Sequence, residues 1–332
     1  MKKVSMQDIA DKLGVSKGTV SLVLSGKAKG SRVSEKTANK VKKMAAEMNY
    51  YPNDIARSLS TGTTMTIGVI VTDISNEFFG RLTFYIQEQA KKYGYTVITS
   101  NTNESLEEFN NAVTTLLNKQ IDGIILVPVA EGHEIVERII KRRIPVVQVD
   151  RYFPGLEASY IVIDNYKASE KAIELLIHKG LKKIASICYN MNVNALVDRR
   201  KGYIDALDRY ELLDSELIKD INYEDQEKQI EQAIVELKNN PERVEALFFS
   251  SKRVFTTGMK YIHREGIKIP EDMEVVCFDK IDSFSILNAP INYIEQPIQE
   301  MGENAVDILM EQINGRKTPI QRVLDAEISF SL

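Results

Sequence analysis

Residues 8–21 read DIADKLGVSKGTVS, and this stretch predicts two short helices joined by a tight turn. The apolar residues before Gly14 fall on one face of a helix that runs from about residue 6 to 13. Gly14 ends that helix, and Ser16 stands where its side chain can cap a second helix over 17–24. A helix, a tight turn and a second short helix together make a helix-turn-helix.

The flanking sequence extends this motif to a basic three-helix headpiece. Ser34 can cap a third helix, whose apolar face holds Val41, Met44, Ala45 and Met48. Residues 1–63 hold ten Lys and two Arg against three Asp and two Glu, a formal charge of +7, which leaves −11 for the rest. Such clustered cations favour a nucleic-acid-binding module, because phosphate neutralisation is local. Taken by charge alone, a merely solvated basic surface is an equally good interpretation.

From Thr66 onward, apolar runs alternate with amphipathic helical stretches. Fully apolar strands separated by helices indicate parallel sheets that are covered on both faces. About 270 residues of this pattern are too many for one sheet of typical width, so we expect two α/β lobes. Ligands of such folds bind beyond the carboxyl ends of the strands. The predicted strands are Ile67–Val71, Thr96–Thr99, Gly123–Val127, Val146–Val149, Ile161–Ile163, Ile184–Cys188, Ala246–Phe249 and Val275–Phe278.

Two further stretches complete a known pattern. Residues 49–53 read NYYPN and residues 56–59 read ARSL. Together with residues 8–21 and Val33-Ser34, they resemble the heads of the lactose-repressor (LacI/GalR) family of bacterial regulators. The resemblance covers nearly the whole chain. It implies an all-α three-helix helix-turn-helix headpiece, followed by an α/β two-lobed sensor domain of the periplasmic-binding-protein-like (type I) fold.

The resemblance and the strand pattern together suggest domain limits. We expect a headpiece over 1–50, a hinge helix and linker over 51–63, and an effector-binding domain over 64–332. Its first lobe is expected over about 64–162 and 291–324, and its second lobe over about 163–290 and 325–332.

The second helix of a helix-turn-helix enters the major groove, and its first residues meet base edges. This geometry predicts base contacts from Lys17, Gly18 and Leu22. Lys17 can donate to guanine, Leu22 can pack on a thymine methyl group, and Gly18 allows close backbone approach. Family members often have a polar residue or Arg where Leu22 stands, so the usual base preference need not hold here. Phosphate contacts are predicted from hydroxyl side chains: Ser16, Thr19 and Ser21.

The segment beyond Pro52 has the composition of a short helix over residues 53–60. The resemblance implies that this hinge helix folds on operator DNA, pairs with its partner's copy and wedges Leu59 into the minor groove. Ala56 is small enough for the two helices to approach closely. An inert tether is the alternative. The hinge residues expected to contact DNA are Asn53, Ala56, Arg57 and Leu59.

Polar and aromatic residues follow several predicted strands. Residues 72–79 read TDISNEFF, in which Asp73 and Asn76 can bind hydroxyl groups. Phe78 and Phe79 suit the C–H faces of a sugar or a flat base, and one of the two is expected to be core packing. Taken singly, the charged residues can also be surface ion pairs. The resemblance adds four effector-binding residues at matching strand ends: Arg151, Arg199, Asp279 and Gln296.

One departure from the family bears on the ligand. Relatives often have an Asn-Asp pair where this chain has Lys252 and Arg253. We therefore include Lys252 among the effector-binding residues. The hypothesis that follows is an anionic effector, such as a uronate or a phosphosugar, with Lys252 as its partner. The alternative is that Lys252 points to solvent.

Enzyme motifs are weak in this chain. Residues 14–18 fit G-x-S-x-G formally, but a helix precedes the serine where a nucleophile elbow needs a strand. The three histidines lie far apart and no phosphate-binding glycine motif follows a strand, so we expect no catalytic residues, no metal and no cofactor. A solute-binding protein of the same fold, without a DNA-binding role, is the main alternative.

The remaining features favour a cytoplasmic protein. No apolar run reaches the roughly 18 residues that a membrane span needs, and the start lacks the apolar region of a signal peptide. Cys188 and Cys277 lie inside apolar runs, which is typical of reduced, buried thiols. We therefore expect a homodimeric, sequence-specific DNA-binding transcriptional regulator, a repressor, that binds double-stranded operator DNA. A small carbohydrate-like effector controls it allosterically, and both signs of that control stay open.

Overall fold

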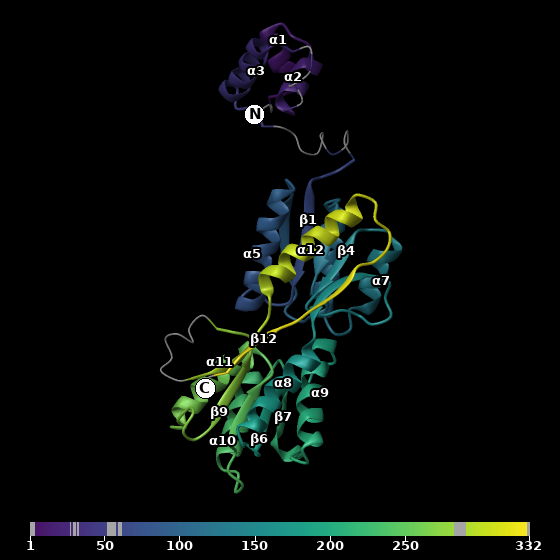
Figure 1. Cartoon of the computed structure of the whole chain (residues 1–332). Coiled ribbons are helices and arrows are strands. Elements are labelled where there is room, and N and C mark those ends of the chain that lie inside the picture. The colour runs from purple at the N-terminus through teal and green to yellow at the C-terminus, as the bar shows by residue number, and fades with distance from the viewer. Residues whose placement is uncertain are drawn as a thin grey trace. The chain divides into compact units, whose positions relative to one another are not determined.

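The computed structural model describes residues 4–26, 28, 31, 33–51, 58, 62–281 and 290–330. Its internal contacts divide the chain into two units, residues 1–64 and residues 65–332. The first unit is helical and the second contains two sheets (Figure 1).

Among its described residues, the first unit contains the helices α1 (Met6–Leu13), α2 (Lys17–Leu24) and α3 (Glu35–Glu47). Each begins after a serine whose hydroxyl accepts a backbone N–H, so local sequence fixes where the helices start. Gly14 ends α1 with φ 64°, a left-handed conformation that glycine adopts without strain. The three predicted helices are confirmed. They close on a small core of Ile9, Ala10, Val20, Val23, Val41 and Ala45.

The first lobe is built on a parallel six-stranded sheet. Helices α5 (Glu77–Lys92) and α12 (Ile298–Ile313) pack on one of its faces. Helices α6 (Leu106–Asn118) and α7 (His133–Lys141) pack on the other. The strand order is β11 (Gln321–Leu324), β5 (Ser159–Ile163), β4 (Val146–Val149), β3 (Gly123–Leu126), β1 (Thr66–Val71) and β2 (Thr96–Asn101).

The second lobe repeats this plan. Helices α8 (Asn165–His178) and α9 (Asn194–Arg209) cover one face of its sheet. Helices α10 (Gln226–Lys238) and α11 (Lys252–Arg264) cover the other. A 3-10 turn, η1 (Ser215–Leu217), precedes the edge strand β7. The strand order is β12 (Glu327–Ser329), β10 (Asn292–Glu295), β9 (Glu274–Phe278), β8 (Ala246–Phe249), β6 (Ile184–Tyr189) and β7 (Ile218–Ile221).

The chain passes between the lobes after β5, after β10 and after β11 (Figure 1). Because β10 pairs with β9, the return to the first lobe comes after Glu295, whereas the sequence placed it near residue 291. The last strand, β12, runs antiparallel to β10, so the second sheet is not purely parallel.

All eight strands predicted from apolar runs are present, and four others were missed. β7, β11 and β12 lie at sheet edges, where β7 has one buried residue and the residues of β11 and β12 are exposed or half-buried. β10 alternates buried and half-buried residues and begins with Asn292. Such strands carry polar side chains, so a search for continuous apolar runs does not find them.

Candidate functional site

The outer face of α2 carries the residues predicted to contact bases. Lys17, Gly18 and Leu22 are all exposed, with Leu22 at 40%. Val20 and Val23, on the opposite face of the same helix, are buried in the headpiece core. The helix thus separates an apolar inner face from an outer face that is open to a partner.

Packing of the headpiece does not require glycine at position 18. A Cβ built there would meet only Ser16 Oγ within 4 Å, at an ordinary 3.7 Å. Ser16 Oγ in turn accepts the N–H of Thr19 at 3.1 Å, so this predicted phosphate contact also fixes the start of α2. Ser21 is half-buried. The predicted hinge contacts lie outside the described residues: Asn53, Ala56, Arg57 and Leu59.

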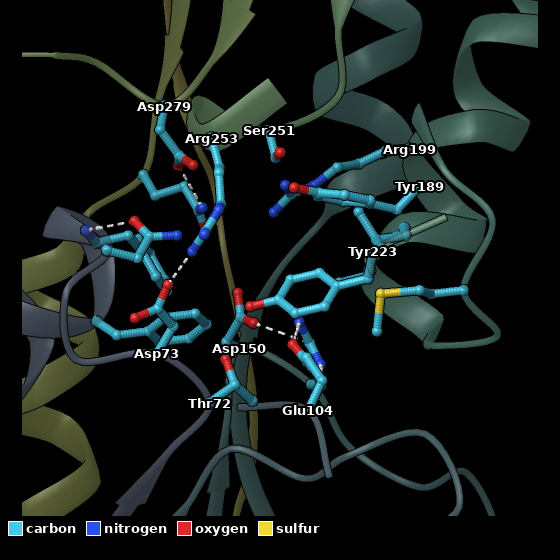
Figure 2. Close-up of a pocket in the computed structure, with 18 residues that line it drawn as sticks. Thr72, Asp73, Glu104, Asp150, Tyr189, Arg199, Tyr223, Ser251, Arg253 and Asp279 are labelled. Carbon is cyan, nitrogen blue, oxygen red and sulfur yellow. Dashed lines mark hydrogen bonds and ion pairs between the residues drawn. The ribbon is translucent and has the colours of Figure 1, made fainter. Parts of the chain in front are cut away.

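A pocket lies between the two lobes, at the carboxyl ends of their strands (Figure 2). This is the edge that the parallel-strand pattern predicted. Its cavity volume is about 70 Å³. Eight of the nine predicted effector residues line it: Asp73, Asn76, Phe78, Phe79, Arg151, Arg199, Asp279 and Gln296.

Arg199 is held rigidly in the wall that the second lobe contributes. Its Nε donates to Asn165 Oδ1 at 2.7 Å, and its Nη1 donates to the Ser250 carbonyl at 2.9 Å. The guanidinium lies 3.5 Å from the centroid of the Phe278 ring, a cation–π contact. Burial lowers the pKa of this guanidinium. A cation fixed in this way can present its remaining N–H groups to a ligand without reorganising.

Asp279 and Gln296 stand beside this arginine at the ends of β9 and β10. Gln296 Nε2 donates to Asp279 Oδ1 at 2.6 Å, while the buried Gln296 Oε1 accepts no hydrogen bond from any described residue. Asp279 has φ 84° and Asp150, after β4, has φ 68°, left-handed conformations that are unusual for a residue with a side chain. Burial raises the pKa of both carboxyl groups. The pocket therefore offers a fixed cation, two fixed carboxyl groups and an unused acceptor.

Arg151 is engaged by a residue that the sequence reasoning missed. Its guanidinium makes a two-pronged ion pair with Glu104, with both N···O distances at 2.8 Å, and its Nε lies 3.4 Å from Asp150 Oδ2. Glu104 follows β2, so its position at a strand end was the signal that could have found it.

The segment after β1 uses its polar side chains for its own structure as well. Asp73 Oδ1 accepts from Ser75 N at 2.9 Å and from Ser75 Oγ at 2.5 Å. Asn76 caps α5, because its Oδ1 accepts from Phe78 N at 3.1 Å. Phe78 and Phe79 are both buried and meet edge to face with ring centroids 5.0 Å apart. Both rings line the pocket, so neither is core packing alone.

Lys252 does not line the pocket, in contrast to the sequence prediction. Its ammonium group pairs with the carboxylate of Glu77, because the first turn of α11 directs it toward α5 rather than toward the cleft. Arg253, the next residue, lines the pocket and pairs with Asp73.

Two tyrosines complete the cleft on the side of the second lobe. The rings of Tyr189 and Tyr223 lie 5.7 Å apart, and Tyr189 Oη donates to Gln226 at 2.5 Å. Tyr189 stands directly after the predicted strand Ile184–Cys188, so its position was a signal that could have found it, whereas Tyr223 follows the unpredicted edge strand β7.

The described His, Cys, Asp and Glu residues contain no group of three that could hold a metal ion. Across the described ranges, no helix is both long enough and apolar enough to span a bilayer. Cys188 and Cys277 are buried free thiols, as predicted.

Two family models match the chain. Residues 5–53 match the bacterial regulatory proteins of the lacI family, and residues 64–330 match the periplasmic binding proteins and sugar binding domain of the LacI family. The second match alone covers more than half of the chain.

Individual proteins agree with these matches. The ribose operon repressor of Halalkalibacterium halodurans is 31% identical over 309 residues, which cover 93% of this chain and 90% of the relative. The transcriptional repressor PurR of Vibrio atlanticus is 31% identical over 315 residues, covering 94% and 92%. A crystal structure of the Lac repressor dimer bound to operator and the anti-inducer ONPF has a TM-score of 0.86 at 22% identity, over 98% of both chains, and so shares the fold.

The fold, the exposed recognition face and the interlobe pocket therefore agree with the sequence matches. The chain belongs to the LacI family of bacterial regulatory proteins and is a DNA-binding transcriptional regulator.

Proposed function

We propose that this regulator is a repressor controlled by a small, neutral, polyhydroxylated effector that binds in the interlobe pocket. The observation that carries the proposal is the convergence of Arg199, Asp279 and Gln296 in one wall of the pocket. A fixed guanidinium beside a fixed carboxylate matches adjacent hydroxyl groups, because the oxygen of one hydroxyl accepts while the other hydroxyl donates. The aromatic rings of the pocket suit the C–H faces of the same ligand.

The charges around the pocket favour a neutral effector over an anionic one. The three guanidinium groups are outnumbered by four carboxyl groups, and two of the three are already paired, Arg151 with Glu104 and Arg253 with Asp73. An anion at either of these two arginines would have to displace the paired carboxylate, and an anion at Arg199 would lie beside Asp279. The four carboxyl groups belong to Asp73, Glu104, Asp150 and Asp279.

For the DNA end of the molecule, we propose base contacts from Lys17, Gly18 and Leu22, and phosphate contacts from Ser16, Thr19 and Ser21. The exposure of the outer face of α2 supports this assignment. The proposed DNA contacts of the hinge are Asn53, Ala56, Arg57 and Leu59. The proposed limits are 1–50 for the headpiece, 51–63 for the hinge and 64–332 for the effector-binding domain, and the regulator is proposed to act as a cytoplasmic homodimer. The solved Lac repressor dimer on operator supports a dimer.

Calorimetry with a panel of ligands tests the effector class. We expect one or more neutral pentoses, hexoses or nucleosides to bind, and their uronate or phosphate analogues to bind at least tenfold more weakly, a difference of about 1.4 kcal/mol. Asp279→Asn should abolish either the binding of the neutral ligand or the preference for it over the anionic analogue. Asp208→Asn, at an exposed position on α9, is the matched control. Tight binding of the anionic analogues alone would contradict the proposal.

A mobility-shift assay tests the DNA-binding role. The full chain should retard DNA from upstream of its own gene, lose affinity steeply as salt rises, and respond to the ligand that calorimetry identifies. If the protein shows no preference for any DNA sequence at any salt concentration, the result would favour a solute-binding protein without a DNA-binding role.

A further inference from the structure

Two ion pairs join one lobe to the other, one inside the pocket and one beside it. Arg253 pairs with Asp73, and Lys252 pairs with Glu77. Both carboxylates belong to the first lobe, where Asp73 follows β1 and Glu77 begins α5. Both cations belong to the second lobe, where they begin α11. The chain's own side chains therefore bridge the two walls between which the effector is proposed to bind.

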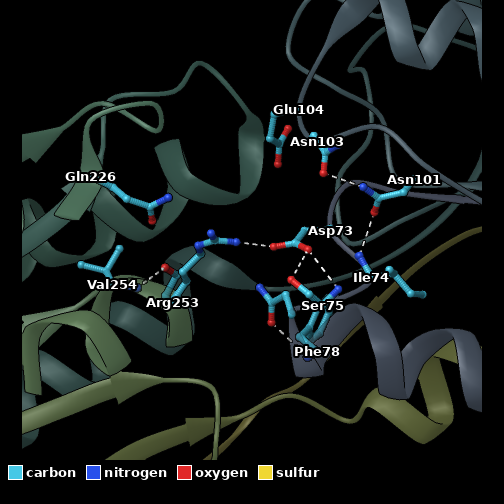
Figure 3. Close-up of polar contacts among 12 residues, drawn as sticks. Asp73, Ile74, Ser75, Phe78, Asn101, Asn103, Glu104, Gln226, Arg253 and Val254 are labelled. Atoms are coloured by element: carbon cyan, nitrogen blue, oxygen red, sulfur yellow. Dashed lines mark hydrogen bonds and ion pairs between the residues drawn. The ribbon is translucent and has the colours of Figure 1, made fainter. Parts of the chain in front are cut away.

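The carboxylate side of this bridge is held in place. Asp73 gives one oxygen to Ser75 and the other to Arg253, so a single side chain joins the turn after β1 to the opposite lobe (Figure 3). The same turn is fixed by Asn101, whose Oδ1 accepts the N–H of Ile74 at 2.8 Å. A rigid carboxylate makes a stronger ion pair, because little side-chain entropy is lost when the pair forms.

The cations occupy positions that are unfavourable without these partners. The first turn of a helix carries partial positive charge, which disfavours Lys and Arg and favours Glu. Lys252 and Arg253 stand in the first turn of α11, which has no acidic residue of its own, whereas Glu77 stands in the first turn of α5. The Lys252 side chain is only 10% exposed, and a buried ammonium group is costly unless it is paired. Asp279 of the same lobe also interacts with Lys252, and the carboxylate of Glu77 is added only while the lobes are together.

The volume of the pocket agrees with a closed arrangement. The pocket is partly open to solvent, and its cavity volume of about 70 Å³ falls short of the roughly 300–1,000 Å³ of ordinary ligand sites. Asp73 and Arg253 are among the side chains that take up this space.

We propose that the pairs Arg253–Asp73 and Lys252–Glu77 form a latch that holds the two lobes closed before any effector binds. An effector then enters only during the fraction of time in which the latch is open, and its association rate is reduced to that fraction of the rate for open lobes. The inference rests on the proposed function only in taking this pocket as the effector site.

The separation of the lobes can be measured directly in the full-length protein without effector. Glu107→Cys and Glu227→Cys place spin labels on exposed positions near the starts of α6 and α10, one in each lobe. The native cysteines are buried and should not react with the label. Pulsed electron resonance on labelled chain diluted with unlabelled chain then reports the distance within one protomer.

In the unaltered latch, the two labels should give one short distance. Lys252→Met or Arg253→Gln should add a longer distance and lower the ratio of closed to open molecules by at least about threefold, the effect expected for one partly exposed ion pair. The double variant Lys252→Glu with Glu77→Lys exchanges the two charges between the lobes and keeps their attraction, so it should restore the short distance. Lys260→Met, an exposed lysine on the same helix, should leave the distance unchanged.

Circular dichroism of each variant confirms that it is folded, and the two single variants test the two pairs separately. The proposal is overturned if Lys252→Met and Arg253→Gln both give the same distance distribution as the protein with the native pairs. This holds whether that shared distribution corresponds to open or to closed lobes. Because no ligand is added, this result is independent of whether a neutral sugar proves to be the effector.

Discussion

The outer face of α2 and the walls of the interlobe pocket are built on different principles. Lys17 and Leu22 stand exposed on a helix whose packing depends on its opposite face. Arg199 and Asp279 are buried and held by hydrogen bonds or ring contacts from the protein itself. A change of Lys17 or Leu22 is therefore expected to alter recognition alone, whereas a change of Arg199 or Asp279 alters both recognition and folding.

The largest combined loss of effector affinity and stability is expected from Arg199→Ala. The change removes the proposed hydroxyl-binding cation and leaves Asn165 Oδ1 and the Ser250 carbonyl buried without their donor. Effector affinity should fall at least about 100-fold, and the free energy of unfolding should fall by about 1–3 kcal/mol. Calorimetry and urea unfolding measure the two effects.

The matched control for that experiment is Arg209→Ala, an arginine of the same helix that is half-exposed and pairs with Glu170 and Glu174. Its loss should change stability little and leave effector affinity unchanged, because solvent screens exposed ion pairs. Equal effects of the two substitutions would mean that Arg199 has no special role in the pocket.

A smaller effect, on stability alone, is expected from Gly202→Ala. A Cβ at Gly202 would collide with the Tyr166 carbonyl oxygen and lie 3.0 Å from Glu170 N, because α8 and α9 pack closely at this point. Both obstacles are backbone atoms and cannot rotate away. Thermal unfolding should show a loss of about 1–3 kcal/mol, and an unchanged transition would show that the two helices separate without cost.

Local sequence was sufficient for the headpiece and for the central strands. Serine caps and Gly14 mark the limits of the first helices, and the central strands are buried on both faces, so both leave clear sequence patterns. The edge strand Ile218–Ile221 and the pairing of β10 with the second sheet depend on neighbours distant in sequence. No local pattern determines them.

The pocket was predictable where a residue follows an apolar strand, as Asp73, Arg151 and Asp279 do. Glu104 was missed because it lies three residues beyond the end of β2 and five beyond the predicted end of that strand. Lys252 and Arg253 show a different limit: adjacent residues on a helix point about 100° apart, and only the packing of α11 decides which of them meets the pocket.

On the DNA side, Lys17→Ala should lower operator affinity without changing stability, in contrast to Arg199→Ala in the pocket. Loss of a base contact costs about 1–3 kcal/mol, so affinity for the operator should fall roughly 5- to 150-fold while unfolding is unchanged. The discriminating readout is a binding assay on operators with single base changes, in which Lys17→Ala should relax the preference at one position. Lys40→Ala on α3 is the matched control, and any loss it causes should be uniform across sequences.

The smallest effect is expected from Gly18→Ala, which should change stability in the direction opposite to Gly202→Ala. Position 18 lies inside α2 with room for a methyl group, so alanine should stabilise the helix by about 0.5–1 kcal/mol, opposite in sign to Gly202→Ala. Hydrogen exchange of the α2 amides should therefore slow. If backbone approach at Gly18 is part of recognition, operator affinity should fall in the same variant, because the methyl group holds the helix away from the bases. A variant that is more stable and binds operator equally well would remove Gly18 from the recognition surface and leave Lys17 and Leu22 as its base contacts.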